Sequence, residues 1–257
     1  MIIKLKILLL GGLNAIILAK QLRHYGVDVT VAKKRCSFRE LRNFDIVYAI
    51  GISELRQLVL LRVFSTKLVL HVVGSDAKKM SRWMKRALVL ANEILYVSRE
   101  IKEEIGLNKG EIIPIPIDTK KFVPRFSSSK RDVLYYCPNE KIYRLNWILR
   151  YAKNHLDETI TVIVDKRNFR HGLSDPRYPN VLFTPAIDYE NMVNCYNQHR
   201  KLIRMTIYDG YPKMPYEALL CELEVIWNGK HITKVPSEMR MENTIPKLIS
   251  ILRKLIP

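Results

Sequence analysis

Short apolar runs alternate with amphipathic segments along the first half of the chain. The apolar runs are rich in Ile, Leu and Val and have the length of buried strands. They lie at 3–10, 28–32, 45–50, 67–73, 92–98 and 111–115. Segments with helical spacing of apolar residues lie at 15–25, 77–91 and 99–105. A repeated strand–helix–strand order predicts an α/β fold with parallel sheets.

The same pattern begins again after a short polar stretch, FSSSKR at 126–131, which we interpret as an interdomain linker. The strands expected after it are 132–137, 159–164, 181–186, 203–208 and 224–227. The helices expected with them are 145–154, 188–196, one beginning near residue 214, and 244–255. The pattern therefore predicts two domains, 1–125 and 126–257.

The segment DGYPKMPYEALL follows the strand expected at 203–208 and carries two carboxylates eight positions apart, Asp209 and Glu217. Gly210 and Pro212 end the strand and leave backbone N–H groups near a helix start, where an anion such as phosphate is favoured. A carboxylate one turn further on accepts two hydroxyl hydrogen bonds, as a ribose diol would offer. The alternative is a capped surface helix with two solvated acids.

Charge and cysteine content change the picture in two ways. The net charge of +18 and a pI near 9.8 indicate an anionic partner, which is nucleic acid, a membrane surface or a charged substrate. A basic bias of the whole proteome explains the same charge. The four cysteines are scattered without a Cys-x-x-Cys pair, which argues against a zinc site and fits a reducing cytoplasm.

The N-terminal stretch 7–19 is free of charge and resembles the core of a signal peptide. It is too short to span a bilayer, and Gly11 and Gly12 lie within it. We interpret it as a strand, a glycine loop and a helix, the opening of a βαβ unit. Such a loop lets the backbone approach a phosphate or sugar closely.

His71 comes at the end of an expected strand, just before Gly74, Ser75 and Asp76. Functional residues gather at the ends of parallel strands, whereas a histidine inside an apolar strand is more often part of the core. Both interpretations stay open.

The helix expected at 77–91 has one apolar face and one basic face. The apolar face carries Met80, Trp83, Met84, Ala87, Leu88 and Ala91. The basic face carries Lys78, Lys79, Arg82, Lys85 and Arg86. Such a helix either packs on its own core or lies in a lipid interface.

The segment DGYPKMPYEALLCELEVI resembles the signature of the retaining family 4 glycosyltransferases, which have the GT-B fold. Asp209 and Glu217 stand at the two acidic positions of that signature. The residues Gly210, Tyr211, Pro212, Ala218, Val225 and Ile226 match as well. Glu222 stands where the family has Gly, and Glu224 stands where it has Pro.

Further segments are similar to the family in the same order along the chain. They are HVVGSD at 71–76, ILYVS at 94–98, IPIPID at 113–118, FVP at 122–124 and NVLFT at 180–184. In the loop 138–144 the family has Gly-Arg and a later Lys that bind the donor diphosphate. Cys137 and Pro138 replace the Gly-Arg pair, so we expect Lys141 and Arg144 to take its place. The alternative is a solvated basic loop in a chain with 43 Lys and Arg residues.

The resemblance implies two doubly wound Rossmann-like domains facing a cleft, an acceptor domain 1–125 and a nucleotide-sugar-binding domain 126–257, with the helix 244–255 crossing back. It implies transfer of a sugar from a nucleotide donor, UDP- or GDP-linked, with retention of configuration and without a metal or cofactor. The catalytic residues would be His71, Asp209 and Glu217. The donor-binding residues would be Gly11, Gly12, Lys141, Arg144, Gly210, Tyr211, Pro212, Lys213 and Met214.

The acceptor is left open by the resemblance as a lipid, a saccharide or a protein. Lipid-glycosylating relatives point to a cytoplasmic protein held on the inner face of the membrane through Lys78, Lys79, Arg82, Trp83, Lys85 and Arg86. Two alternatives remain, a DNA-modifying glycosyltransferase and a non-catalytic binding protein on the same scaffold. Three departures favour the second of these, namely Asp209 in place of Glu, Glu222 in place of Gly and Glu224 in place of Pro.

Overall fold

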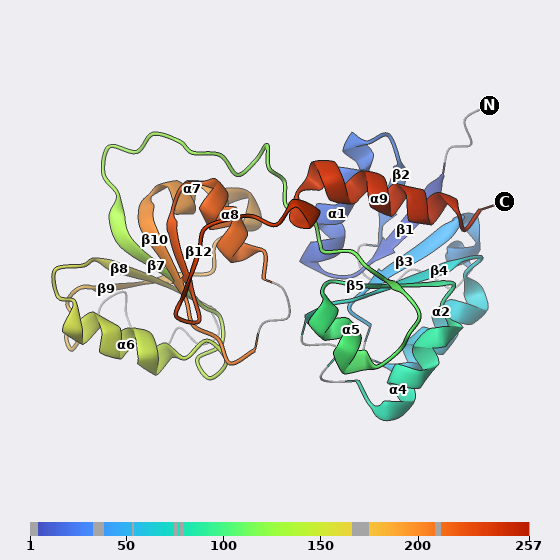
Figure 1. The fold of residues 1–257 in the computed structure, drawn as a ribbon, viewed down its shortest axis with the longest axis horizontal. Helices are drawn as coiled ribbons and strands as arrows, with labels where there is room; N and C mark the ends of the chain where they lie inside the picture. The colour runs from blue at the N-terminus through green and yellow to red at the C-terminus, as the bar shows by residue number, and fades with distance from the viewer. Residues whose placement is uncertain are drawn as a thin grey trace. The chain divides into compact units, whose positions relative to one another are not determined.

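Two six-stranded sheets organise the chain, each in its own compact unit (Figure 1). The computed structural model describes residues 5–32, 39–52, 54–74, 77, 80–165, 175–208 and 212–256. Unit 1 comprises Met1–Pro116 and Pro236–Pro257, and unit 2 comprises Ile117–Val235. The α/β class predicted from the alternation of strands and helices is confirmed.

The sheet of unit 1 is parallel throughout, in the order β2-β1-β3-β4-β5-β6. Its strands are β1 Lys6–Leu10, β2 Asp28–Val31, β3 Ile46–Ile50, β4 Leu68–Val72, β5 Glu93–Tyr96 and β6 Glu111–Ile112. The strands β3 and β4 are buried along their whole length, because helices cover both faces of the sheet.

Helices α1 and α9 lie on one face of this sheet, and α2, α4 and α5 lie on the other (Figure 1). Their bounds are α1 Leu13–His24, α2 Leu55–Phe64, α4 Arg82–Ala87, α5 Arg99–Ile105 and α9 Met241–Arg253. Short 3₁₀ helices are η1 Glu40–Asn43, η2 Leu88–Leu90 and η4 Ser237–Met239. The C-terminal helix α9 therefore belongs to unit 1, although it follows unit 2 in the sequence.

The sheet of unit 2 has the order β12-β11-β10-β7-β8-β9, parallel except for the last hairpin strand. Its strands are β7 Arg131–Cys137, β8 Ile160–Val164, β9 Val181–Pro185, β10 His199–Arg204, β11 Glu224–Trp227 and β12 Lys230–Ile232. The helices are α6 Leu145–Asn154, η3 Tyr189–Asn191, α7 Met192–Asn197 and α8 Met214–Leu220. The β11–β12 turn is Asn228-Gly229, both with positive φ, as a two-residue hairpin requires.

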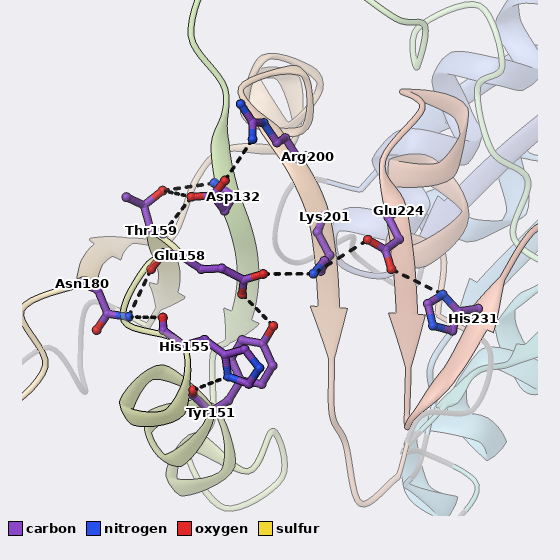
Figure 2. A network of polar contacts seen from close by, with 10 residues as sticks. All are labelled: Asp132, Tyr151, His155, Glu158, Thr159, Asn180, Arg200, Lys201, Glu224 and His231. Carbon is purple, nitrogen blue, oxygen red and sulfur yellow. Dashed lines mark hydrogen bonds and ion pairs between the residues drawn. The ribbon is translucent and has the colours of Figure 1, made fainter.

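A polar network crosses the edge of this sheet where the strands begin (Figure 2). Lys201 of β10 bridges two carboxylates, Glu158 at 3.2 Å and Glu224 at 3.8 Å. The Tyr151 hydroxyl donates to the other oxygen of Glu158 at 2.6 Å. Asp132 accepts from the backbone N–H and the hydroxyl of Thr159. This edge of the sheet is therefore held together by its own side chains.

Among the predicted elements whose bounds differ from the structure, two bear on the predicted sites. The strand expected at 203–208 is β10 His199–Arg204, because its pairing with β7 places Ile203 opposite Tyr135 and begins at the polar His199. The helix expected at 77–91 is interrupted: Ala77 is helical, Met80 and Ser81 are not, and α4 begins at Arg82 and is followed by η2. The Ser81 hydroxyl accepts from the Met84 N–H at 3.1 Å and starts this helix later than the apolar spacing predicts.

The chain passes from unit 1 to unit 2 after Pro116, whereas the sequence prediction placed the boundary after residue 125. Phe122 explains the difference. Its ring packs against the rings of Tyr189 and Tyr196, at centroid distances of 5.7 and 5.9 Å. These aromatic contacts attach the segment before the polar stretch to unit 2.

Candidate functional site in unit 2

The chain leaves neighbouring strands β7 and β10 in opposite directions along the sheet of unit 2. From β7 it passes through α6 to β8, and from β10 it passes through α8 to β11. The loops after these strands therefore diverge at the carboxyl edge, which is the topological switch point where open α/β sheets bind ligands. The segment singled out from the sequence follows β10, so it begins at this point.

Tyr135 fixes the two diverging loops to each other. Its buried hydroxyl lies 2.5 Å from the Tyr143 carbonyl of the first loop and 3.4 Å from the Met205 carbonyl of the second. A backbone hydrogen bond from the Ile207 N–H to the Ile142 carbonyl, at 2.9 Å, adds a second connection. Hydrogen bonds between backbone groups and the Tyr135 hydroxyl thus hold the two loops at the switch point in place.

Arg204 ends β10 and brings a buried cation to the same edge. Its guanidinium lies 4.9 Å from the ring centroid of Tyr143 and 5.8 Å from that of Tyr136, and its Nη1 lies 3.4 Å from the sulfur of Met214. Contacts with aromatic faces stabilise a desolvated guanidinium. Sequence reasoning missed this residue because the strand was expected to continue to residue 208.

Glu217 lies one turn into α8 and is only 4% exposed. Its carboxylate accepts hydrogen bonds from the Tyr196 hydroxyl at 3.2 Å and from the Tyr189 hydroxyl at 3.4 Å. Burial raises the pKa of Glu217, while the nearby Lys213 and the two hydroxyls act in the opposite direction. Burial and the Glu217 charge raise the pKa of both tyrosines, so they remain hydroxyl donors at neutral pH.

Two lysines surround the ring of Tyr189. The Lys121 Nζ lies 3.9 Å from the ring centroid and pairs with Glu190 at 2.9 Å, and the Lys213 Nζ lies 5.3 Å from the same centroid. Burial lowers the pKa of Lys213, and the Glu217 carboxylate opposes that shift. Glu217 is thereby held among tyrosine hydroxyls and cationic groups, an environment that suits a buried carboxylate.

Some of the residues predicted for donor binding lie at the carboxyl edge of the unit 2 sheet, and others lie outside the described residues. Lys141 and Arg144 lie exposed in the loop between β7 and α6, where Arg144 has a φ of 46°. Pro212, Lys213 and Met214 lie at the start of α8, at the same edge. Asp209, Gly210 and Tyr211 lie outside the described residues.

Gly11 and Gly12 follow β1 in unit 1. Gly11 has a φ of 146°, and a Cβ there would lie 3.1 Å from the Ile50 carbonyl oxygen. Glycine is therefore required at this position by the packing of β1 against β3. A Cβ on Gly12 would meet no atom within 4 Å.

His71 is part of the core of unit 1. Its Nε2 donates to the Ile113 carbonyl at 2.7 Å, so its Nδ1 accepts from the Tyr48 hydroxyl at 2.7 Å. Burial lowers the pKa of His71 to about 4, which leaves the ring neutral at physiological pH. Both ring nitrogens are occupied inside the unit, and we therefore interpret His71 as a structural histidine rather than a catalytic one.

The face expected to lie in lipid at 77–91 also differs from the prediction. Met80, Met84, Leu88 and Ala91 are buried in unit 1, whereas Trp83 is 71% exposed. Arg82, Lys85 and Arg86 lie on α4 with Trp83, and the Arg86 guanidinium lies 5.6 Å from the Trp83 ring. Lys78 and Lys79 lie outside the described residues.

Among the residues that the structure describes, no three His, Cys, Asp or Glu side chains are close enough together to hold a metal ion. No helix in the described ranges combines the length and the apolar character that crossing a membrane requires.

Comparison by sequence finds neither a matching protein-family model nor a matching curated protein. Comparison of structures finds AviGT4, a glycosyltransferase involved in avilamycin A biosynthesis, at a TM-score of 0.64 and 13% identity over 98% of each chain. It also finds HepE from Anabaena in complex with UDP and glucose, at a TM-score of 0.59 and 16% identity, covering 98% of this chain and 91% of that one.

A third similar structure, TarM, has a TM-score of 0.57 and 9% identity over 82% of this chain. The match covers 48% of TarM, so this chain spans about half of that protein. Identities this low establish the fold alone, and the resemblance to family 4 stays a prediction. The chain has the GT-B fold class, with two Rossmann-like α/β domains.

Proposed function

We propose that this protein transfers a sugar from a nucleotide-sugar donor to an acceptor, with retention of configuration at the anomeric carbon. The observation that carries the proposal is the buried carboxylate of Glu217 beside cationic side chains at the switch point of unit 2. A ribose diol needs a hydrogen-bond acceptor, and a diphosphate needs positive charge. The fold class agrees with this assignment, and HepE is a structure of that fold solved with UDP and glucose.

Glu217 would bind the ribose of the donor. The contact from the Tyr189 hydroxyl, at 3.4 Å, is at the long limit for a hydrogen bond, so a ribose hydroxyl can replace it. The Tyr196 hydroxyl, at 3.2 Å and fully buried, would stay and hold the carboxylate in place. The donor base is uracil or guanine in this proposal.

Lys141, Arg144 and the backbone before α8 would bind the diphosphate, and Asp209 would lie near the donor sugar. In the reaction the bond between the anomeric carbon and the phosphate oxygen breaks, and the nucleoside diphosphate leaves with the electron pair. The acceptor oxygen forms the new bond on the same face, and its proton passes to the leaving phosphate. Cationic side chains offset the charge that develops there, so the scheme needs no metal.

The experiment that tests this function is calorimetric titration with UDP-, GDP- and ADP-sugars. Glu217→Gln should weaken binding of the preferred donor by roughly 1.5–3 kcal/mol, because a charge-assisted acceptor is lost. Replacing Lys141 and Arg144 together by Ala should weaken the donor much more than the free nucleoside. Equal donor affinity in wild type and Glu217→Gln would remove Glu217 from the site, and no binding of any donor would overturn the function.

On the acceptor side we propose a membrane-associated molecule and a cytoplasmic protein bound peripherally at the inner face of the membrane. The exposed Trp83 with Arg82 and Arg86 on α4 supports this, as does the excess of positive charge.

The replacement of the family's glycine by Glu222 is no longer a reason to favour a non-catalytic binding protein. Glu222 has a φ of 63°, a left-handed backbone conformation that glycine adopts without strain. We therefore infer that replacing glycine by glutamate here lowers the stability of the fold and leaves the reacting groups unchanged.

A further inference from the structure

Unit 1 exposes a set of apolar side chains on α2, α4 and η2. On α2 these are Leu55, Val59 and Val63, which are 41%, 41% and 62% exposed. Their spacing of four places them in one stripe along the helix. Trp83 of α4 is 71% exposed, and Val89 and Leu90 of η2 are about half exposed.

These exposed groups belong to neighbouring elements on one face of the sheet. Helix α2 packs against both α4 and η2, and Figure 1 shows α2 and α4 on the same side of unit 1. The same elements already supply buried residues to the core, among them Leu58, Leu61, Met84 and Leu88. The outer apolar groups are therefore a second set that the core of unit 1 does not use.

The charged side chains carried by α2, α4 and η2 themselves are all positive. The sequences of α2 and of 82–90 contain no Asp or Glu. They contain five basic residues, Arg56, Arg62, Arg82, Lys85 and Arg86. Lys85 pairs with Glu104 at 3.7 Å, and the four arginines are exposed. Exposed apolar groups interleaved with arginines suit a partner that has an anionic surface and an apolar layer directly beneath that surface.

We propose that α2, α4 and η2 form a docking face for an anionic lipid bilayer, in which Val59, Val63 and Trp83 enter the boundary between headgroups and acyl chains. The arginines would lie at the level of the lipid phosphates. The sequence placed the lipid contact on the basic residues and Trp83 of a single helix, whose other apolar residues Met84 and Leu88 are buried in the core. Two of the three apolar groups of the contact come from α2, which nothing in the sequence pattern singled out.

This inference deepens the proposed function and rests on it in one respect, namely the class of acceptor. Leu55 begins α2 at the carboxyl edge of β3, and the loop Gly11-Gly12 follows the adjacent strand β1 at the same edge. The apolar stripe of α2 thus starts at the switch point of unit 1. A unit docked by this stripe takes its acceptor from the lipids of the bilayer.

Co-sedimentation of the full chain with vesicles tests the docking face. Vesicles of phosphatidylcholine with phosphatidylglycerol should bind the protein, and vesicles of phosphatidylcholine alone should bind it at least tenfold more weakly. Changing Val59, Val63 and Trp83 together to Gln should lower the affinity for anionic vesicles at least tenfold. Changing Arg56, Arg62, Arg82 and Arg86 together to Gln should lower it at least as much and remove its salt dependence.

The matched controls lie in unit 2. Leu156→Gln changes an apolar residue of similar exposure, 67%, and Arg150→Gln with Arg200→Gln changes exposed arginines. These variants should bind vesicles within twofold of wild type, and circular dichroism should show every variant folded. Vesicle binding that survives the α2 and Trp83 substitutions overturns the inference, as does equal affinity for duplex DNA and anionic vesicles.

Donor binding measured on the same variants separates this inference from the proposed function. Val59, Val63 and Trp83 lie outside the donor site, so donor affinity should be unchanged when vesicle affinity falls. A protein that binds a nucleotide sugar but no vesicle overturns the docking face and leaves the function standing. A protein that binds vesicles through this face but no nucleotide sugar supports the face and overturns the function.

Discussion

At Glu217, burial and hydrogen bonding act in opposite directions on one carboxyl group. Burial raises its pKa above the ordinary 4.5, and the Tyr196 and Tyr189 hydroxyls and Lys213 favour its charged form. A carboxyl whose pKa is raised by folding is stabilising below its ordinary pKa and loses that contribution as the pH rises through the folded value. The tyrosine hydroxyls therefore matter most where the carboxyl is ionised.

Replacing Tyr196 by Phe should destabilise the protein more near pH 7 than near pH 4. The change removes the donor at 3.2 Å from a buried carboxylate, which costs about 1–3 kcal/mol in free energy of unfolding while Glu217 is charged. The cost should shrink as the pH falls through the raised pKa of Glu217 and the carboxyl group is protonated. Urea titrations at both pH values measure it, with Tyr25→Phe, a partly exposed tyrosine of unit 1, as the control. A cost that is the same at both pH values would contradict this account.

The sequence predicted Glu217 as a site residue but could not predict its surroundings. Tyr196 and Tyr189 lie 21 and 28 positions away, on elements that meet only when the sheet of unit 2 has formed. Local spacing carries no signal of such contacts. For His71 the sequence left two interpretations open, and our structural interpretation rests on a hydrogen bond to Ile113, which is 42 positions away.

At the scale of elements, a local motif explains one departure from the family signature. Helix α8 ends in a Schellman motif, in which the Leu223 N–H donates to the Ala218 carbonyl at 3.2 Å and the Glu222 N–H donates to the Leu219 carbonyl at 3.0 Å. This geometry places Glu222 in the left-handed region, with a φ of 63°. A side chain there is strained, and glycine is not.

Glu222→Gly should therefore stabilise unit 2 by about 1 kcal/mol. Glu103→Gly makes the same chemical change at an exposed position inside helix α5 and should destabilise unit 1 by about 1 kcal/mol, because glycine there has only an entropic cost. Denaturant unfolding of both variants measures whether the free energy of unfolding rises for Glu222→Gly and falls for Glu103→Gly. Destabilisation by both substitutions would mean that the Glu222 side chain makes a contact that outweighs the backbone strain.

Element bounds were predicted well where the local pattern and the tertiary pairing agree. The helices α5 and α6 and the strand β11 have the bounds predicted from their apolar spacing. The strand β10 begins and ends about four residues before the apolar run, because its register is set by pairing with β7 and β11. That shift placed Arg204 at the edge of the sheet and kept it out of the predicted site.

At the scale of the whole molecule, unit 1 is built from both ends of the chain. Helix α9 contributes Ile245, Leu248 and Leu252 to its core, all fully buried, and packs against α1. The Lys247 Nζ lies 3.6 Å from Glu111, in the strand before the chain leaves for unit 2. The sequence predicted this helix and its apolar face, but helical spacing alone does not say which unit the face packs on.

Removing residues 236–257 should destabilise unit 1 and spare unit 2. Loss of three fully buried aliphatic side chains costs roughly 1.5–3 kcal/mol each, a large fraction of the stability of a domain this size. Hydrogen exchange followed by mass spectrometry should show lost protection in β1, β3 and β4, with unchanged protection in β7, β8 and β10. Leu248→Ala tests the same packing without a truncation and should give the same pattern to a smaller extent, whereas protection lost equally in both sheets would mean that the units unfold as one cooperative body.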